Sequence, residues 1–158
     1  MEKNIHFKLL YESSECIPIL ADLWYQEIGQ YWVKGSSREA VSQKLQLHLN
    51  QEKLPIAIVA FAGCQPVGMV CLRKNDGIWE ELTPWLGSLV VHPNFRRQKI
   101  GNILIDKVKD MAKALGYKIL YLLAFDPTIS QWYERLGWSY IGFDELLNHR
   151  VTVMRIQL

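Results

Sequence analysis

The sequence has few cysteines, and their spacing matches no pattern for pairing or for metal binding. The three cysteines, Cys16, Cys64 and Cys71, are an odd number, and no Cys-x-x-Cys pair or Cys/His ligand pattern occurs. A disulfide framework or a structural zinc site would need such a pattern. The sequence therefore predicts buried free thiols in a reducing compartment and no metal site.

Long hydrophobic runs are also absent. The longest apolar stretches, such as residues 56–62, are far shorter than the roughly 18 residues that a membrane-spanning helix needs. The first ten residues include Glu2, Lys3 and Lys8, which is unlike a signal or transit peptide. We therefore expect a soluble, cytoplasmic protein without a membrane partner.

A large excess of charge of either sign is missing as well. The 158 residues hold 18 Lys and Arg against 16 Asp and Glu, for a formal net charge of +2. This balance is too weak to predict a nucleic acid or an acidic membrane as the main partner. The length and the 49% hydrophobic content predict one globular domain over residues 1–158 and argue against disorder.

Hydrophobic periodicity predicts the element order β-α-α-β-β-β-α-β-α-β-β. The predicted strands cover residues 5–9, 56–62, 67–72, 85–91, 119–124, 138–143 and 151–156. The predicted helices run from a cap at Ser13 or Ser14 to Ile28, from a Ser36–Glu39 capping box to Leu49, over 100–115 and over 128–136, with a loop over 29–35. A strand-helix-strand unit among hairpin-linked strands implies an α/β (α+β) fold, with a mixed sheet and helices on both faces.

Basic side chains cluster where the strand over 85–91 gives way to the helix over 100–115. They are His92, if protonated, with Arg96, Arg97 and Lys99. Helix N-termini present unpaired N–H groups and a partial positive charge, so they bind phosphate and disfavour cations. Three cations placed there suggest a bound anion, for which a diphosphate fits best. A solvated basic turn is the alternative, and these residues alone leave both open.

The same segment resembles the signature of the GNAT superfamily of acyl-CoA N-acyltransferases. That signature, [Q/R]-x-x-G-x-[G/A] within V-x-P-x-[Y/F]-R, is matched by Val91-His-Pro-Asn-Phe-Arg-Arg-Gln-Lys-Ile-Gly101, where Lys99 replaces the first glycine. A second family element, N-x-x-A-x-x-x-Y-E-K-x-G-F, is matched by residues 126–138, with Asp126 in place of asparagine and Tyr133 retained. Residues 82–86 are similar to small bacterial members. The two motifs and the element order together carry the resemblance.

The resemblance implies that acetyl-CoA binds in a V-shaped gap between residues 85–91 and 119–124. Backbone amides of Leu89 and Val91 would bind the pantetheine arm and polarise the thioester carbonyl, and those from Arg97 to Asn102 would hold the pyrophosphate. The expected cofactor-binding set is Leu89, Val90, Val91, Arg96, Arg97, Gln98, Lys99, Ile100, Gly101, Asn102 and Asp126. Because φ is negative in a first helical turn, we expect Lys99 to be tolerated with its side chain outward. Asp126 lacks the amide donor of asparagine.

The resemblance further implies that an amine attacks the thioester directly in a ternary complex. No Cys–His or Ser–His arrangement is recognisable, which agrees with a reaction that needs no enzyme nucleophile. Tyr133 is the candidate general acid. Since a thiol has a pKa of about 8.5 and a tyrosine about 10, its contribution is best described as a hydrogen bond to the leaving thiolate. A tyrosine that merely packs between its helix neighbours is the alternative.

The general base is not fixed by the sequence. The family position that carries a glutamate in some members falls near Trp85, which cannot serve. Glu80 and Glu81 lie just upstream and could act through water. Of the two, Glu81 is the candidate general base. His92 could titrate near neutrality, but a structural or cofactor-facing role suits a strand-end histidine better.

Aromatic residues are the candidates for the acceptor pocket. Tyr31, Trp32 and Trp85 are expected to bind the substrate, and Trp79 could join them; core packing is the alternative for Trp79 and Trp85. His6, His48 and His149 show no ligand spacing, and we expect them at the surface or as caps.

The sequence thus predicts an N-acetyltransferase that transfers an acetyl group from acetyl-CoA to a primary amine of a small molecule or peptide. A non-catalytic acyl-CoA-binding or regulatory module of the same fold is the alternative. Nucleic-acid binding through the basic turn is disfavoured by the charge balance. We expect a monomer or homodimer without a metal ion.

Overall fold

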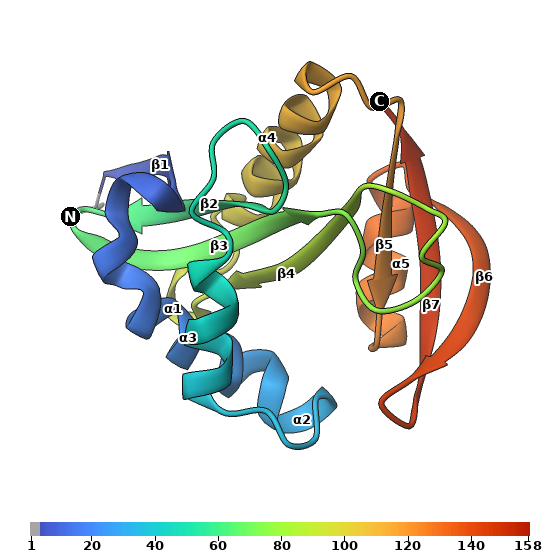
Figure 1. Ribbon diagram of the computed structural model, residues 1–158, viewed down its shortest axis with the longest axis horizontal. Helices are drawn as coiled ribbons and strands as arrows, with labels where there is room; N and C mark the ends of the chain where they lie inside the picture. Colours follow the sequence, from blue (N-terminus) through green and yellow to red (C-terminus); the bar gives the residue numbers. More distant parts are fainter. Residues whose placement is uncertain (1–3) are drawn as a thin grey trace.

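A mixed β-sheet forms the centre of the protein in a computed structural model that describes residues 4–158 (Figure 1). These residues form seven strands, in the spatial order β1-β2-β3-β4-β5-β7-β6. All neighbouring strands run antiparallel except β4 and β5, which are parallel. The strands are β1 (Ile5–Leu9), β2 (Ile56–Ala62), β3 (Gln65–Arg73), β4 (Trp85–Val91), β5 (Ile119–Ala124), β6 (Ser139–Leu146) and β7 (His149–Gln157). The predicted element order is confirmed.

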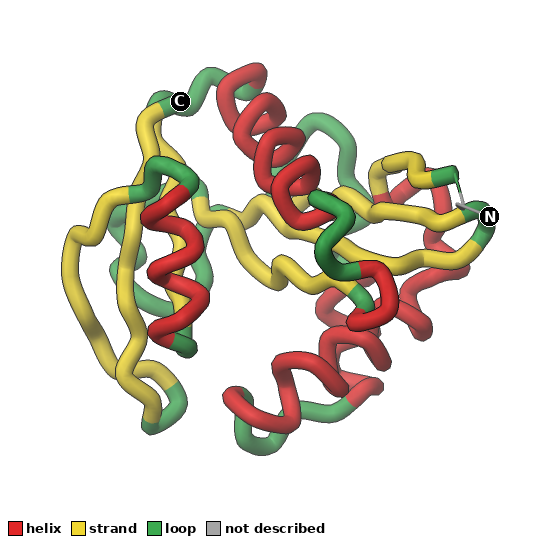
Figure 2. The backbone as a smooth tube through the Cα atoms, turned by 180° about the vertical axis from the view of Figure 1, so that it is seen from behind, coloured by secondary structure: helices red, strands yellow, loops and turns green. Residues whose placement is uncertain are grey.

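Helices cover both faces of the sheet, as the sequence predicts (Figures 1 and 2). They are α1 (Ile17–Trp24), α2 (Gln30–Trp32), α3 (Arg38–Gln46), α4 (Ile100–Ala114) and α5 (Pro127–Arg135). On one face α4 and α5 bury a cluster that includes Leu104, Val108 and Tyr133. On the other face α1 and α3 bury Leu20 and Leu45 against β2 and β3. No helix of the described chain is long and apolar enough to cross a membrane.

The N-terminal helices begin and end at other residues than the sequence predicts. Helix α1 begins after a 3-10 segment over Leu10–Cys16 and has no side-chain cap, so the predicted Ser13 or Ser14 cap is wrong. A π-helical turn over Tyr25–Gly29 continues α1 into α2, so the chain stays helical through Trp32 where a loop was expected. The cap of α3 is Ser37 rather than Ser36, because the Ser37 hydroxyl accepts from the Ala40 N–H at 3.1 Å.

The three cysteines are free thiols, but only two of them are buried. Cys16 and Cys71 lie in the core under α1 and α3. Cys64 is exposed, because it occupies the turn that joins β2 to β3. The prediction of buried thiols is therefore wrong for Cys64.

Strands β4 and β5 separate along their length, and this separation positions the site. Their register contains one pair, Trp85 with Tyr121, after which the two strands diverge (Figure 1). On the other side of β4, its pairing with β3 shifts register between Met69 and Cys71, and Ser88 adopts a φ of 52°. Such a bulge bends a strand and increases its twist. The bend therefore accompanies the opening of the sheet between β4 and β5.

Candidate active site

A cavity of about 870 Å³ lies where β4 and β5 part. Residues 86–91 of β4 form one wall, and the end of β5 with the start of α5 forms another. The first turn of α4 closes one end, and α1, α2 and α3 contribute further lining side chains such as Trp24, Trp32 and Lys44. The cavity therefore reaches residues from both helical layers.

The wall formed by β4 presents backbone amides to the cavity. The His92 N–H donates to the Val67 carbonyl of β3 at 2.7 Å. Because N–H groups alternate in direction along a strand, those of Val91 and Leu89 point away from β3 and toward the gap. Both residues line the cavity, as does Val90. Parting from β5 thus leaves backbone donors available to an extended ligand.

The turn between β4 and α4 has an unusual backbone. Arg97 and Lys99 have φ angles of 64° and 62°, and Lys99 is the residue that precedes the first turn of α4. The expectation of a negative φ at Lys99 is therefore wrong, because the residue lies outside the helix in the left-handed region that glycine adopts freely. Successive N–H groups in such alternating conformations form a concave anion-binding surface.

The charges of this turn are only partly neutralised. Arg96 donates to Glu27 at 2.8 Å and to the Val91 carbonyl at 3.2 Å. Neither Arg97 nor Lys99 has an ion-pair partner among residues 4–158, and both line the cavity. His92 accepts from the Asn94 N–H at 3.1 Å and so caps its own turn. Two unpaired cations and the N-terminus of a 15-residue helix therefore face the same end of the cavity.

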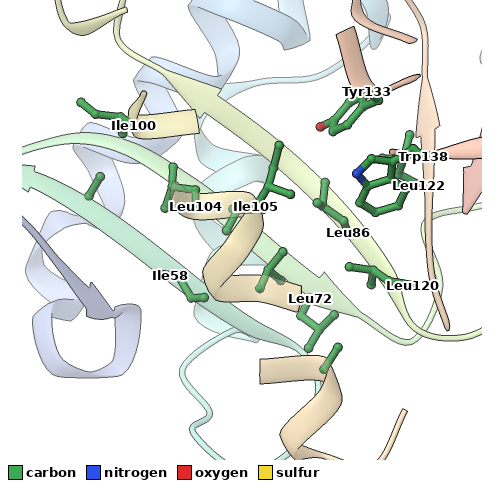
Figure 3. Close-up of a cluster of buried hydrophobic side chains, with 14 of the residues drawn as sticks. Ile58, Leu72, Leu86, Ile100, Leu104, Ile105, Leu120, Leu122, Tyr133 and Trp138 are labelled. Atoms are coloured by element: carbon green, nitrogen blue, oxygen red, sulfur yellow. The ribbon is translucent and has the colours of Figure 1, made fainter. Parts of the chain in front are cut away.

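Tyr133 of α5 lies on the cavity wall opposite β4, with its side chain almost fully buried. Its ring packs against Trp132 at 5.1 Å and Trp138 at 5.6 Å between centroids. Figure 3 shows its hydroxyl directed toward β4 and the indole of Trp138 beneath the ring. Burial and the nearby charge of Asp76 raise the pKa of Tyr133, so the phenol stays protonated and is able to donate a hydrogen bond.

Asp126 holds the start of α5. Its carboxylate accepts from the Thr128 N–H at 2.9 Å and from the Thr128 hydroxyl at 2.8 Å. Helix capping needs only a side-chain oxygen, which aspartate and asparagine both supply. The Asp126 side chain lines the cavity while it performs this capping role.

A buried polar network lies at the end of the cavity near α3. Arg73 donates from Nε to His48 Nε2 at 2.9 Å, and from its terminal nitrogens to Asp76 at 3.0 Å and Ser88 at 2.9 Å. His48 is buried, and its Nδ1 donates to the Lys44 carbonyl at 2.8 Å. The expectation that His48 lies at the surface is therefore wrong. Burial, together with the charge of Arg73, lowers the pKa of His48 to about 4, so its ring is neutral.

Sequence reasoning missed this network. Only a lone arginine at the end of an apolar strand, followed by Asn75-Asp-Gly77, could have indicated it. The buried Arg73 needs acceptors, but nothing in the sequence says that His48, 25 positions away, supplies one.

The structure places the remaining candidates in different surroundings. Trp32 lines the cavity and stacks on Phe125 at 5.7 Å between ring centroids. Trp85 is completely buried in a third cluster with Ile78 and Tyr121, so it belongs to the core and does not line the cavity. Tyr31 and Glu81 are exposed and lie outside the cavity wall.

Trp79 is partly buried and donates to Asp144 at 2.6 Å, which ties the loop before β4 to β6. His6 stacks on Phe61, and His149 packs edge-on against Trp32. Within residues 4–158, no group of three or more His, Cys, Asp or Glu side chains could hold a metal ion.

Comparison with known proteins decides the family. The model of the Acetyltransferase (GNAT) family matches residues 21–138. The chain belongs to the GNAT acetyltransferase family. It is therefore an acyltransferase, and acetyl-CoA is its acetyl donor. No curated protein matches the chain significantly.

Solved structures share this fold at low sequence identity. An acetyltransferase from Thermus thermophilus has a TM-score of 0.74 at 18% identity over 100% of both chains. One from Streptococcus agalactiae has a TM-score of 0.75 at 18% identity over 98% of each chain. An aminoglycoside 6'-N-acetyltransferase complexed with coenzyme A has a TM-score of 0.72 at 17% identity, over 98% of this chain and 96% of that one.

The residues of this GNAT member fit the shape and charge of the donor. A coenzyme A molecule carries a diphosphate and a long arm with amide groups. Arg97 and Lys99 supply unpaired cations at the α4 end of the cavity, and Leu89 and Val91 direct N–H groups into it. This end of the cavity therefore suits a diphosphate and an amide arm.

The left-handed backbone at Lys99 predicts a stability difference between two substitutions. Lys99→Gly and Lys99→Ala remove the same charge, but glycine has no Cβ to strain at a φ of 62°. We expect Lys99→Gly to be more stable than Lys99→Ala by about 1 kcal/mol, measured by urea unfolding. At Lys109, inside α4, the order should reverse, because glycine destabilises a helix interior. Equal stabilities for the Lys99 pair would contradict a strained backbone there.

The neutral, buried His48 predicts a loss of stability in acid. The unfolded chain protonates this histidine near pH 6.5, whereas the folded chain does so near pH 4. Because the unfolded state binds more protons in that interval, the free energy of unfolding should be highest above about pH 6.5. It should fall as the pH drops toward 4, by on the order of 2–3 kcal/mol.

Urea unfolding at a series of pH values measures this effect. His48→Gln keeps a donor and an acceptor without titrating, so its stability should fall less over the same range. The same slope in the wild type and in this variant would exclude His48 as the cause.

Proposed function

We propose that this acetyltransferase transfers an acetyl group from acetyl-CoA to a primary amine of a small molecule or peptide, by direct attack in a ternary complex. The observation that carries the proposal is the cavity between β4 and β5. It has backbone donors on one wall, the Tyr133 hydroxyl on another, and no cysteine or histidine among its described lining residues. A covalent acyl-enzyme would need an activated nucleophile, whereas direct transfer needs both substrates in one cavity.

The donor would be held at two places. The backbone amides from Arg97 to Asn102, with the free cations of the turn, suit the diphosphate. The N–H groups of Leu89 and Val91 suit the amide arm and the thioester carbonyl. When bound, acetyl-CoA supplies the acetyl group as a reactive thioester.

The chemistry forms one N–C bond and breaks one C–S bond. The attacking nitrogen loses a proton, and the departing sulfur gains one. The N–H groups on β4 would stabilise the negative charge that develops on the carbonyl oxygen. Tyr133 would donate a hydrogen bond to the sulfur, which its protonated state allows. The attacking amine must be neutral, and no described cavity residue is a histidine that could accept its proton.

The second candidate is a non-catalytic acyl-CoA-binding module. It is favoured by the absence of a free carboxylate at the expected position, since Glu81 lies outside the cavity wall. It predicts coenzyme A binding without thiol release in the presence of amines. The retained Tyr133, and the part of the cavity near α3 that the donor would leave free, argue for turnover.

Release of free thiol from acetyl-CoA with a panel of primary amines tests the proposal. We expect amine-dependent release, with the acetylated amine detected by mass spectrometry in equal amount. Tyr133→Phe should lower turnover by about 100-fold or more, because a positioned acid contributes this much. Glu134→Gln changes the exposed neighbour on the same helix and should leave turnover unchanged. Full activity of Tyr133→Phe would reject the role of its hydroxyl, and binding of coenzyme A without release would favour the second candidate.

A further inference from the structure

The end of the cavity near α3, away from the basic turn before α4, holds a fixed carboxylate. Asp76 follows β3 in a turn that the Asn75 side chain closes. The Asn75 side-chain oxygen accepts from the Gly77 N–H at 2.7 Å, and the Asn75 amide group donates to the Ile78 carbonyl at 2.7 Å. Arg73 holds one Asp76 oxygen, Oδ1, at 3.0 Å. The turn and Arg73 together fix the position of the Asp76 carboxylate.

Room for this carboxylate comes from Gly87 on β4. A Cβ at Gly87 would lie 2.6 Å from Arg73 and 3.1 Å and 3.3 Å from the two Asp76 oxygens. The missing side chain therefore lets the Arg73–Asp76 pair lie against the strand. The second oxygen, Oδ2, has no hydrogen-bond partner among residues 4–158 and remains available to a ligand.

Asp76 and Tyr133 face the same cavity and interact electrostatically. Both residues line the cavity, and the carboxylate charge contributes to the raised pKa of the Tyr133 phenol. An ammonium group bound by Asp76 would therefore lie within the electrostatic reach of the residue proposed to bind the departing sulfur. This is the region in which an acceptor amine has to be placed.

Lys44 of α3 adds a cation to this end of the cavity. It lines the cavity and has no ion-pair partner in the described chain. Although the residue as a whole is exposed, desolvation and the charge of Arg73 lower the pKa of its ammonium group, and the charge of Asp76 opposes this only in part. An anion placed beside Lys44 would relieve both effects.

A polycationic acceptor is a poor match for this cavity. Its described carboxylates are Glu27, Asp76 and Asp126, and each already accepts from Arg96, Arg73 or Thr128 respectively. With Arg97 and Lys99 assigned to the diphosphate of the donor, the described cations that remain to face an acceptor are Lys44, Arg73 and Arg96. An acceptor with one ammonium and one anionic group fits this balance better than one with several ammonium groups.

We propose that the acceptor is a zwitterionic amine of the amino-acid type. Asp76 binds its ammonium group through Oδ2, and Lys44 binds its carboxylate. Trp24, Trp32 and Phe125 line the same cavity and provide an apolar surface for an aromatic or aliphatic side chain. This inference rests on the proposed acetyl transfer and names the class of its acceptor.

Thiol release with matched amines tests the inference. Phenylalanine and phenethylamine differ by the carboxylate alone, and spermidine and an aminoglycoside represent polycations. We expect a KM about tenfold lower for phenylalanine than for phenethylamine, since a charge-assisted contact contributes about this much, and weaker use of both polycations. Titration of phenylalanine into the coenzyme A complex, followed by calorimetry, should show the same preference without turnover.

Two substitutions assign the preference to residues. Lys44→Met should raise the KM for phenylalanine to that for phenethylamine, whereas Lys113→Met, at the far end of α4, should leave the preference intact. Asp76→Asn should raise the KM for both amines by about tenfold or more, with Asp106→Asn as the matched control. Thermal unfolding checks that Asp76→Asn still folds with Arg73 unpaired, and the Lys44 variant tests the proposal without that risk.

The possible failures are distinct. Thiol release with phenethylamine or a polycation preferred over phenylalanine would overturn this inference and leave the proposed function in place. A preference for phenylalanine that survives Lys44→Met would overturn the assignment to Lys44. Absence of release with every amine would overturn the proposed function and this inference with it.

Discussion

The parting of β4 from β5 is the constraint on which the rest of the site depends. Two parallel neighbours that pair at Trp85 and Tyr121 and then diverge leave one edge of β4 without a partner inside the sheet. In a closed sheet the N–H groups of Leu89 and Val91 would bond the next strand. Here they face a cavity, and the bulge at Ser88 bends β4 where the opening begins. The candidate site is thus a region where the sheet is left incomplete.

This opening joins two regions with different chemistry. On one side the turn before α4 collects backbone donors and the cations of Arg97 and Lys99, which have no ion-pair partner within residues 4–158, and this suits a polyanionic donor. On the other side a network fixed by Arg73 presents Asp76, while Tyr133 lies on the wall between them. Arg73 holds the Asp76 carboxylate in place, so this group needs little reorganisation on binding. The small net charge of the chain gives no indication of this separation of charge within the cavity.

Much of the fold could be predicted from the sequence, because strand alternation and the apolar face of α4 are local patterns. The position of the basic turn before α4 was also accessible, since the motif residues and the strand-to-helix pattern agree there. The positive φ of Lys99 could not be predicted, because it depends on whether the residue lies inside the helix or one position before it. His48 and Asp76 could not be placed either, since their roles depend on Arg73 meeting them through tertiary structure. Trp85 shows the same limit: an aromatic residue suits a pocket and a core equally well until burial is known.

Amide hydrogen exchange with and without coenzyme A tests most directly the claim that the donor occupies the opening between β4 and β5. The account predicts slower exchange at Leu89, Val91 and residues 97–102 on binding, with α3 and the β6–β7 hairpin unchanged. These amides are available now because the sheet is open beside them. Coenzyme A binding that protects other segments and leaves these amides exchanging at their original rates would contradict the account.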